Sequence, residues 1–174
     1  NINKIINFRE NELVLDLCCG PGRHDNPIVK FGCRVIGLDY SMPLLKMASA
    51  AVPYGNRFPL FVRGDARNLP FKSNFFDVVL NLFTSFGYFE DDENFELLKS
   101  INNILKPGGR FLIDYLNPPK VCSELVPETV RKKEGMNIIE KRTHDKESNR
   151  IIKKIIISKD NETQTFIESV RLYS

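Results

Sequence analysis

The sequence predicts an α/β protein whose core is a doubly wound, mostly parallel sheet, followed by an antiparallel β-meander. In residues 1–119, short and continuously apolar runs alternate with amphipathic stretches, as in parallel strands covered by helices on both faces. In residues 120–174 no clear helical period is present, and extended runs are separated by polar turns. We therefore expect two domains, 1–119 and 120–174.

The elements of the first domain follow from apolar runs and from the residues that end them. A glycine turn at residues 20–22 closes the first run, Pro27 suits a first helical turn, and Ser41 is a plausible N-cap. The sequence Lys106-Pro107-Gly108-Gly109 is expected to stop the last helix. The expected strands are 13–18, 33–38, 58–62, 76–82 and 110–116, and the expected helices are 27–32, 42–51 and 92–105.

The second domain contains four extended runs without helical spacing. Polar turns at 145–149 and 159–162 separate three of them, which favours strands that pair with their neighbours in sequence. The expected strands are 130–133, 137–143, 150–158 and 163–172. We interpret Asn117-Pro118-Pro119-Lys120 as a stiff linker into this domain.

Composition excludes several classes of protein. The 174 residues are 42% hydrophobic and 27% charged, which argues against a disordered chain, a collagen-like chain and a disulfide scaffold. No apolar run is long enough for a membrane span, and no secretory leader is present, so we expect a cytoplasmic protein. The four cysteines lack metal-ligand spacing, and we expect free thiols and no metal site.

The small net charge of +3 is unevenly distributed. Residues 1–119 carry 13 basic and 13 acidic groups, whereas residues 120–174 carry 12 basic and 9 acidic groups. The whole excess therefore lies in the predicted meander. It is too small to indicate nucleic-acid binding by itself.

Polar residues follow the predicted parallel strands, at the sheet edge where open α/β proteins bind ligands. Gly20 and Gly22 permit a tight turn with exposed amides that favour an anionic group, although such turns are also common as purely structural features. Asp39 follows the second strand and suits the two hydroxyls of a ribose, or equally the N-cap of the next helix. Asp65 follows the third strand and suits an exocyclic amine.

The residues after the fourth strand, 81–89, combine aromatic and polar side chains. A glycine turn, a ribose carboxylate, an amine-binding carboxylate and an aromatic lip thus occur in order, one for each strand. Together these features describe an adenosine site.

The same segments carry a family resemblance. They resemble the successive motifs of class I S-adenosylmethionine-dependent methyltransferases, over about residues 12–116. The strand-rich tail resembles a small-molecule branch in which a β-insert follows the fifth strand. The resemblance implies a Rossmann-like sheet of order 3-2-1-4-5. The matching segments are Val14–His24, Gly37-Leu38-Asp39, Gly64-Asp65-Ala66, Phe76-Asp77-Val78-Val79 and Leu105-Lys106-Pro107-Gly108-Gly109.

The resemblance also implies S-adenosylmethionine as the cofactor and assigns roles to residues. Asp16, Gly20 and Gly22 would hold the methionine part of the cofactor, and Cys18 in the same turn is a further cofactor-binding candidate. Asp39 would bind the ribose hydroxyls, with Tyr40 beside the adenine. The remaining cofactor-binding candidates are Asp65 and Ala66 at the adenine edge, and Asn81 and Leu82 under the methionine end.

The chain departs from the family pattern in three places. Cys18 stands where the family usually has glycine, and we expect the turn to form because cysteine is small. The N-terminal helix is shortened to residues 1–8. The chain also stops at Ser174, before the last helix and the C-terminal hairpin of the family sheet. From these ends we expect a fragment of a longer protein.

Methyl transfer from a sulfonium needs an aligned nucleophile more than a strong base. The weak candidates for a catalytic group are therefore Tyr88, on the aromatic lip, and His24, which follows the glycine turn. We expect the methyl to pass to an oxygen, nitrogen or carbon atom of a small-molecule acceptor. No membrane partner is expected, and the oligomeric state is not predicted.

Three alternatives remain beside this expectation. One is an RNA or protein methyltransferase whose mildly basic tail faces a phosphate backbone, although the same basic residues also fit solvated strand faces. A fold relative that binds the cofactor without transferring a methyl also fits the sequence. A nicotinamide-dependent oxidoreductase fits less well, because Asp25 stands where the dinucleotide pattern has its third glycine.

Overall fold

The computed structural model describes residues 2–53, 55, 57–160 and 162–173. The chain divides into two compact units. Unit 1 comprises Asn1–Ser85 and Asp92–Tyr115, and unit 2 comprises Phe86–Asp91 and Leu116–Ser174. The segment Phe86–Asp91, which the sequence placed in the first domain, therefore packs with the residues of the tail.

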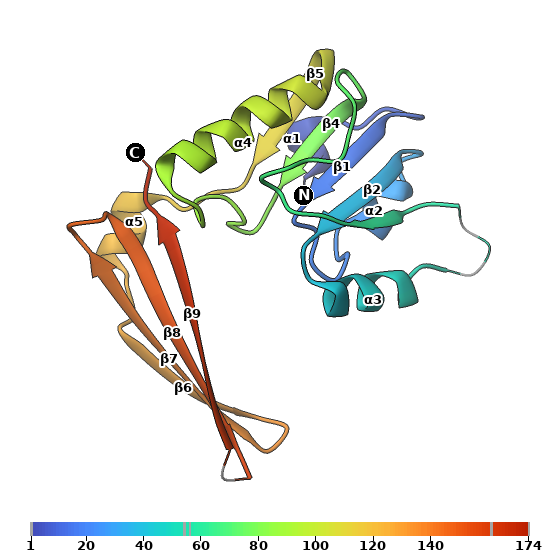
Figure 1. Cartoon of the computed structure of the whole chain (residues 1–174). Coiled ribbons are helices and arrows are strands. Elements are labelled where there is room, and N and C mark those ends of the chain that lie inside the picture. Colours follow the sequence, from blue (N-terminus) through green and yellow to red (C-terminus); the bar gives the residue numbers. More distant parts are fainter. Residues whose placement is uncertain (1, 54, 56, 161, 174) are drawn as a thin grey trace. The chain divides into compact units, whose positions relative to one another are not determined.

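Unit 1 contains a five-stranded sheet in which every neighbouring pair of strands is parallel (Figure 1). Its order is β3-β2-β1-β4-β5, which confirms the predicted topology. Apolar strands buried on both faces are expected in a parallel sheet, and all five residues of the first strand are buried. The strands are β1 (Leu13–Leu17), β2 (Arg34–Asp39), β3 (Leu60–Arg63), β4 (Phe76–Asn81) and β5 (Leu105–Ile113).

Helices cover both faces of this sheet (Figure 1). On one face, α1 (Asn3–Ile6) and α2 (Asp25–Val29) contribute Ile6 and Ile28 to a buried cluster with the sheet residues Val14, Val35 and Val78. On the opposite face lies α4 (Asp91–Ile104), which buries its apolar stripe through Leu97, Ile101 and Ile104. A short helix α3 (Met42–Ala50) follows β2.

Several boundaries in unit 1 differ from the sequence prediction, and two of these differences have a local cause. The helix α2 begins at Asp25 rather than at Pro27, so proline takes its third position. Proline is tolerated there because amides of the first helical turn have no intrahelical acceptor. The segment Lys106–Gly109 lies inside β5 as an irregularity opposite Phe76–Val78, with Gly108 at a φ of 75°. The strand therefore begins directly after α4 instead of at Arg110.

Unit 2 is built on a four-stranded antiparallel sheet of order β6-β7-β8-β9, which confirms the predicted meander. Its strands are β6 (Glu128–Lys133), β7 (Met136–Asp145), β8 (Arg150–Lys159) and β9 (Glu162–Arg171). The predicted turn at 159–162 includes residue 161, which lies outside the described residues.

The segment predicted to be a stiff linker is a helix instead. Helix α5 spans Pro118–Ser123, and the side chain of Asn117 accepts a hydrogen bond from the Lys120 amide at 3.3 Å. Asparagine at the N-cap followed by proline is a favourable helix start. A helix of six residues is too short to show the 3.6-residue period by which helices are recognised in a sequence. No helix in the described part of the chain is long and apolar enough to cross a membrane.

Unit 2 neutralises its buried charges internally. The carboxylate of Glu140, which is 7% exposed, accepts a hydrogen bond from Thr129 and faces Arg131, Arg142 and Lys153. Although burial raises the pKa of Glu140, the Thr129 hydroxyl and these cations hold it below its usual range. Three basic side chains of the tail are therefore paired with one carboxylate.

The buried guanidinium of Arg150 explains why Phe86–Asp91 belongs to unit 2. It donates hydrogen bonds to the carbonyls of Gly87 at 3.2 Å, Tyr88 at 2.9 Å and Phe89 at 3.2 Å. It also binds the hydroxyl of Ser169 on β9 at 2.8 Å. One side chain thus satisfies three carbonyls of a loop that has no regular secondary structure.

Replacing Arg150 should destabilise unit 2. Arg150→Met removes the guanidinium donor from all three carbonyls, of which Gly87 keeps the Arg171 amide at 2.8 Å, and should lower the free energy of unfolding by about 3 kcal/mol. Urea unfolding measures the loss. Lys154→Met, an exposed position on the same strand, is the matched control and should change stability little. Equal effects of the two substitutions would contradict this account.

Candidate functional site

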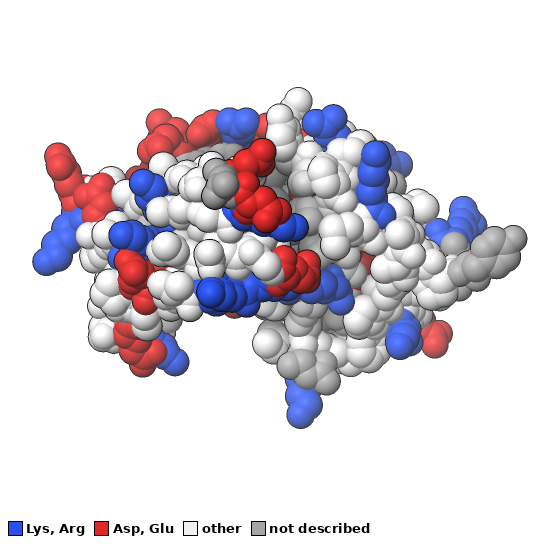
Figure 2. Space-filling model, turned by 90° about the horizontal axis from the view of Figure 1, so that it is seen from below, with Lys and Arg blue, Asp and Glu red and all other residues white. Residues whose placement is uncertain are grey.

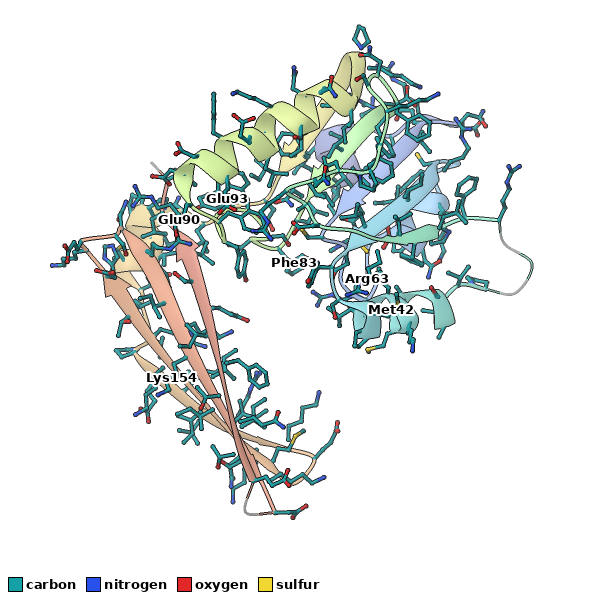
Figure 3. The ribbon with its side chains drawn as sticks, viewed as in Figure 1. Met42, Arg63, Phe83, Glu90, Glu93 and Lys154 are labelled. Carbon is teal, nitrogen blue, oxygen red and sulfur yellow. The ribbon has the colours of Figure 1, made fainter. Side chains whose placement is uncertain are left out.

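The carboxyl ends of four parallel strands meet at one edge of the sheet in unit 1. In register, Leu17 of β1 pairs with Leu38 of β2 and with Asn81 of β4, and Asp39 pairs with Arg63 of β3. The predicted site residues that follow these strands are therefore brought to a common edge, as the sequence indicated. Figure 3 labels Arg63 and Phe83 at this edge.

The turn after β1 takes an unusual backbone conformation. Cys18, Gly20 and Gly22 have φ angles of 62°, 57° and 72°, all in the left-handed region. A Cβ on Gly22 would lie 3.0 Å from the Ala48 side chain and 3.1 Å from Phe61, so packing requires glycine there. The turn forms with Cys18 in place of the family glycine, as expected, but at the cost of a strained backbone.

Asp39 connects this turn to the second strand. One carboxylate oxygen accepts the amide of Gly20 at 2.8 Å, and the other accepts the amide of Ser41 at 2.8 Å. Ser41 occupies the N-cap of α3, but its side chain makes no capping bond. These two bonds hold the Asp39 side chain in place. Because each carboxylate oxygen has two lone pairs, the side chain can still accept further hydrogen bonds.

Three polar side chains are buried beside the turn. Asp16 is 1% exposed, Asp25 is 0% exposed and Asn81 is 1% exposed. Within the described residues, Asp16 Oδ2, Asn81 Oδ1 and both Asp25 carboxylate oxygens have no hydrogen-bond partner. Buried polar atoms normally have partners, so these unpaired atoms point to a polar ligand.

The buried carboxyls hold their protons more tightly than usual. Burial raises the pKa of Asp16 well above its usual range, and the nearby charges of Asp25 and Asp39 raise it further. Burial also raises the pKa of Asp25 to about 7. The pKa of the Cys18 thiol is also raised, to about 12. Burial is the largest cause, and the negative charges of Asp39, Asp16 and Asp65 add to it.

Sequence reasoning missed Asp25 as a site residue. It noted Asp25 only as the position that breaks a dinucleotide pattern, whereas a Gly22 Cβ would lie 3.2 Å from its carboxylate. No sequence signal distinguishes a buried aspartate at the start of a helix from an exposed one.

The Asp65 carboxylate is bound by Arg67. It accepts hydrogen bonds from the Arg67 amide at 2.9 Å and from the Arg67 guanidinium at 2.7 Å, and Arg67 also pairs with Glu93. These bonds from Arg67 hold the pKa of Asp65 below its usual range. Asp65 is therefore a fixed carboxylate, and the adjacent Ala66 is buried.

Aromatic residues occur near two other strand ends. Tyr40 is 68% exposed, and the Arg63 guanidinium lies 5.6 Å from its ring centroid. After β4, Leu82 is buried and Phe83 lies between His24, at 5.2 Å between ring centroids, and Arg23, at 4.8 Å. An exposed, positioned aromatic ring suits stacking against a flat ligand group.

The two catalytic candidates lie in different units. His24 belongs to unit 1. Burial lowers the pKa of its imidazole, and the positive charge of Arg23 lowers it further. Its imidazole is therefore neutral near pH 7 and can accept a proton. Tyr88 belongs to unit 2, where its carbonyl accepts a hydrogen bond from Arg150. The predicted aromatic lip is thus divided between the units after Ser85.

Comparison with known families matches residues 14–109 to a family described as a methyltransferase domain. The matched region contains the glycine turn and every cofactor-binding candidate named above. The chain belongs to this methyltransferase family.

Individual relatives are named as methyltransferases. The chain is 39% identical, over 113 residues, to the demethylmenaquinone methyltransferase of Lactiplantibacillus plantarum, covering 62% of this chain and 46% of that protein. The chain therefore spans about half the length of the curated relatives it matches.

Solved methyltransferases have similar folds. The CcbJ methyltransferase of Streptomyces caelestis matches with a TM-score of 0.78 and 25% identity, covering 97% of this chain and 70% of that one. CalS10, an amino pentose methyltransferase of Micromonospora echinaspora solved with S-adenosylmethionine bound, has a TM-score of 0.63 and 19% identity over 94% of this chain and 70% of that one. The latter likeness concerns the fold alone.

Replacing Cys18 by glycine should stabilise the protein. Glycine removes the left-handed strain, which costs about 1–2 kcal/mol, but adds freedom to the unfolded chain. The expected net gain in the free energy of unfolding is about 0.5–1 kcal/mol. Cys18→Ala keeps a Cβ at this position and is the control, expected to give no gain. Urea unfolding distinguishes the two, and a glycine variant no more stable than the alanine variant would refute the strain.

Replacing Asp25 by asparagine should make stability less dependent on pH. The folded protein holds the Asp25 proton up to about pH 7, whereas the unfolded chain releases it near pH 4. Within this window the folded state binds more protons, so the free energy of unfolding of the parent falls as pH rises.

Asp25→Asn should therefore be more stable than the parent at pH 8, by on the order of 2 kcal/mol, and should match it near pH 4. Urea unfolding at both pH values measures the difference. A difference that stays constant with pH would show that Asp25 does not titrate in this window.

Proposed function

We propose that the chain is the cofactor-binding part of an S-adenosylmethionine-dependent methyltransferase that acts on a small molecule. The observation that carries the proposal is Asp39, whose two oxygens are fixed by the amides of Gly20 and Ser41 at the shared strand edge. A carboxylate oriented in this way suits the adjacent hydroxyls of a ribose.

The unpaired polar atoms fit the rest of such a cofactor. Asp16 and Asn81 supply buried acceptor oxygens without partners in the described part of the chain, which suit the ammonium group of a methionine moiety. The left-handed turn at Gly20 and Gly22 leaves the backbone close to this edge. Tyr40 and the fixed carboxylate of Asp65 would lie toward the adenine. When bound, S-adenosylmethionine supplies an electrophilic methyl on a sulfonium.

The protein's part is positioning rather than strong acid–base chemistry. The buried oxygens of Asp16 and Asn81 and the fixed carboxylate of Asp39 would orient the two ends of the ligand. If the acceptor must lose a proton, His24 is the better candidate, because its neutral imidazole belongs to the same unit as the proposed cofactor residues. The acceptor atom, oxygen, nitrogen or carbon, would be set by residues outside this cofactor edge.

Several observations favour a small acceptor over RNA. Glu140 pairs with Arg131, Arg142 and Lys153, and Glu128 pairs with Lys141, so these four basic side chains are engaged by carboxylates within the sheet. Figure 2 shows basic and acidic side chains interspersed over the face in view. An RNA-binding surface would present a basic stripe instead. A cytoplasmic location is part of this proposal.

Replacing Asp39 should weaken cofactor binding in the 174-residue chain. Asp39→Asn removes the charge and one of the two acceptor oxygens, so the affinity for S-adenosylhomocysteine should fall about 30- to 100-fold. Isothermal titration calorimetry measures it. Asp92→Asn, an exposed position at the start of α4, is the matched control and should bind like the parent. Failure of the parent chain to bind S-adenosylhomocysteine or S-adenosylmethionine would remove the proposal.

A further inference from the structure

A thiol, an imidazole and an amide form a hydrogen-bonded chain in unit 2. Cys122 lies near the end of α5 and is exposed. Its Sγ is 3.5 Å from Nδ1 of His144 on β7. The other ring nitrogen, Nε2, is 3.2 Å from Oδ1 of Asn149, in the turn between β7 and β8.

The backbone fixes the direction of this chain. Asn149 Nδ2 donates to the Leu172 carbonyl at 2.9 Å, and the Leu172 amide donates to the Asn149 carbonyl at 2.8 Å. Since its amide nitrogen faces a carbonyl, Asn149 must present its oxygen to the imidazole. His144 Nε2 then carries the ring proton and donates it. The remaining nitrogen, Nδ1, has a free lone pair that accepts the S–H of Cys122.

This order of groups activates a sulfur nucleophile. A base within hydrogen-bond reach removes the thiol proton, and a third group holds the base in its correct tautomer. The other three cysteines differ in this respect. Burial raises the pKa of Cys33 to about 11 and that of Cys18 to about 12, and Cys19 is buried as well. Cys122 alone among the four combines exposure with an imidazole partner.

We propose that Cys122 is a covalent modification site that exchanges with low-molecular-weight disulfides, with His144 as its base and Asn149 as a positioning residue. The S–H proton passes to His144 Nδ1, and the Cys122 sulfur attacks one sulfur of the disulfide. A new S–S bond forms as the old one breaks, and the second half leaves as a thiolate that takes up a proton. No further oxidant is needed, because the disulfide is itself the oxidant.

The charges near the pair are one ion pair and one further carboxylate. Lys120 of α5 and Glu124, the C-cap residue of that helix, lie 4.0 Å apart, on either side of Cys122 in sequence. Beside His144 on β7, Asp145 accepts the hydroxyl of Ser148 and the amide of Glu147. On the neighbouring strand, Ile151 is the register partner of His144. Together, the described charges of Lys120, Glu124 and Asp145 therefore add no net cation that would activate the thiol without His144.

The proposal is tested by the rate at which the whole chain reacts with oxidised glutathione, followed by intact mass and peptide mapping. We expect one adduct, on Cys122, and none in Cys122→Ser. An unassisted thiol loses about tenfold in rate between pH 8 and pH 7, because its thiolate fraction falls. The parent should lose less than about threefold over this range, since His144 removes the proton. A full tenfold loss, or an adduct elsewhere, would overturn the proposal.

Three variants test whether His144 activates Cys122 or whether Cys122 reacts only because it is exposed. His144→Ala should slow the reaction at pH 7 about tenfold and restore the steep pH dependence. Asn149→Asp keeps an acceptor oxygen beside Nε2 and should react at least as fast as the parent. Ser123→Ala, next to Cys122 and exposed, is the control and should leave the rate unchanged. An unchanged rate in a folded His144→Ala chain would also overturn the proposal. If this variant does not fold, the pH dependence of the parent's rate still tests whether His144 assists the reaction.

Discussion

The arrangement of unit 1 depends on one carboxylate. Asp39, the last residue of β2, accepts the amides of Gly20 and Ser41 and so joins the turn after β1 to the start of α3. The turn has a second bond to the same strand, because the Cys19 amide donates to the Leu38 carbonyl at 3.0 Å. The Asp39 carboxylate also lies at the edge where parallel sheets bind ligands. Asp39 thus serves both the conformation of the turn and the proposed ligand site.

The two units treat buried charge in opposite ways. In unit 2, Glu140 and Arg150 are buried and fully engaged, the former by three cations and the latter by loop carbonyls. In unit 1, Asp16 and Asp25 are buried with oxygens that lack partners among the described residues. Unpaired buried carboxyls destabilise a fold, and such sites are concentrated where a ligand completes the interactions.

Apolar periodicity predicted the parallel strands and the meander, and the family resemblance implied the sheet order. Sequence reasoning missed features that depend on three-dimensional neighbours. Asp25 reads as an ordinary helix start, and its burial follows from packing against the glycine turn. Residues Pro118–Ser123 form a helix too short to show a period. The contact between Cys122 and His144 joins residues on separate elements, which no local pattern indicates.

A crystal structure of the chain with S-adenosylhomocysteine tests the central claim most directly. The account predicts that both ribose hydroxyls lie within hydrogen-bond distance of Asp39, while the Gly20 and Ser41 amides keep their bonds to the same carboxylate. It also predicts an amino group beside the buried oxygens of Asp16 and Asn81. A ligand bound away from this strand edge, or an Asp39 that contacts only the backbone, would contradict the account.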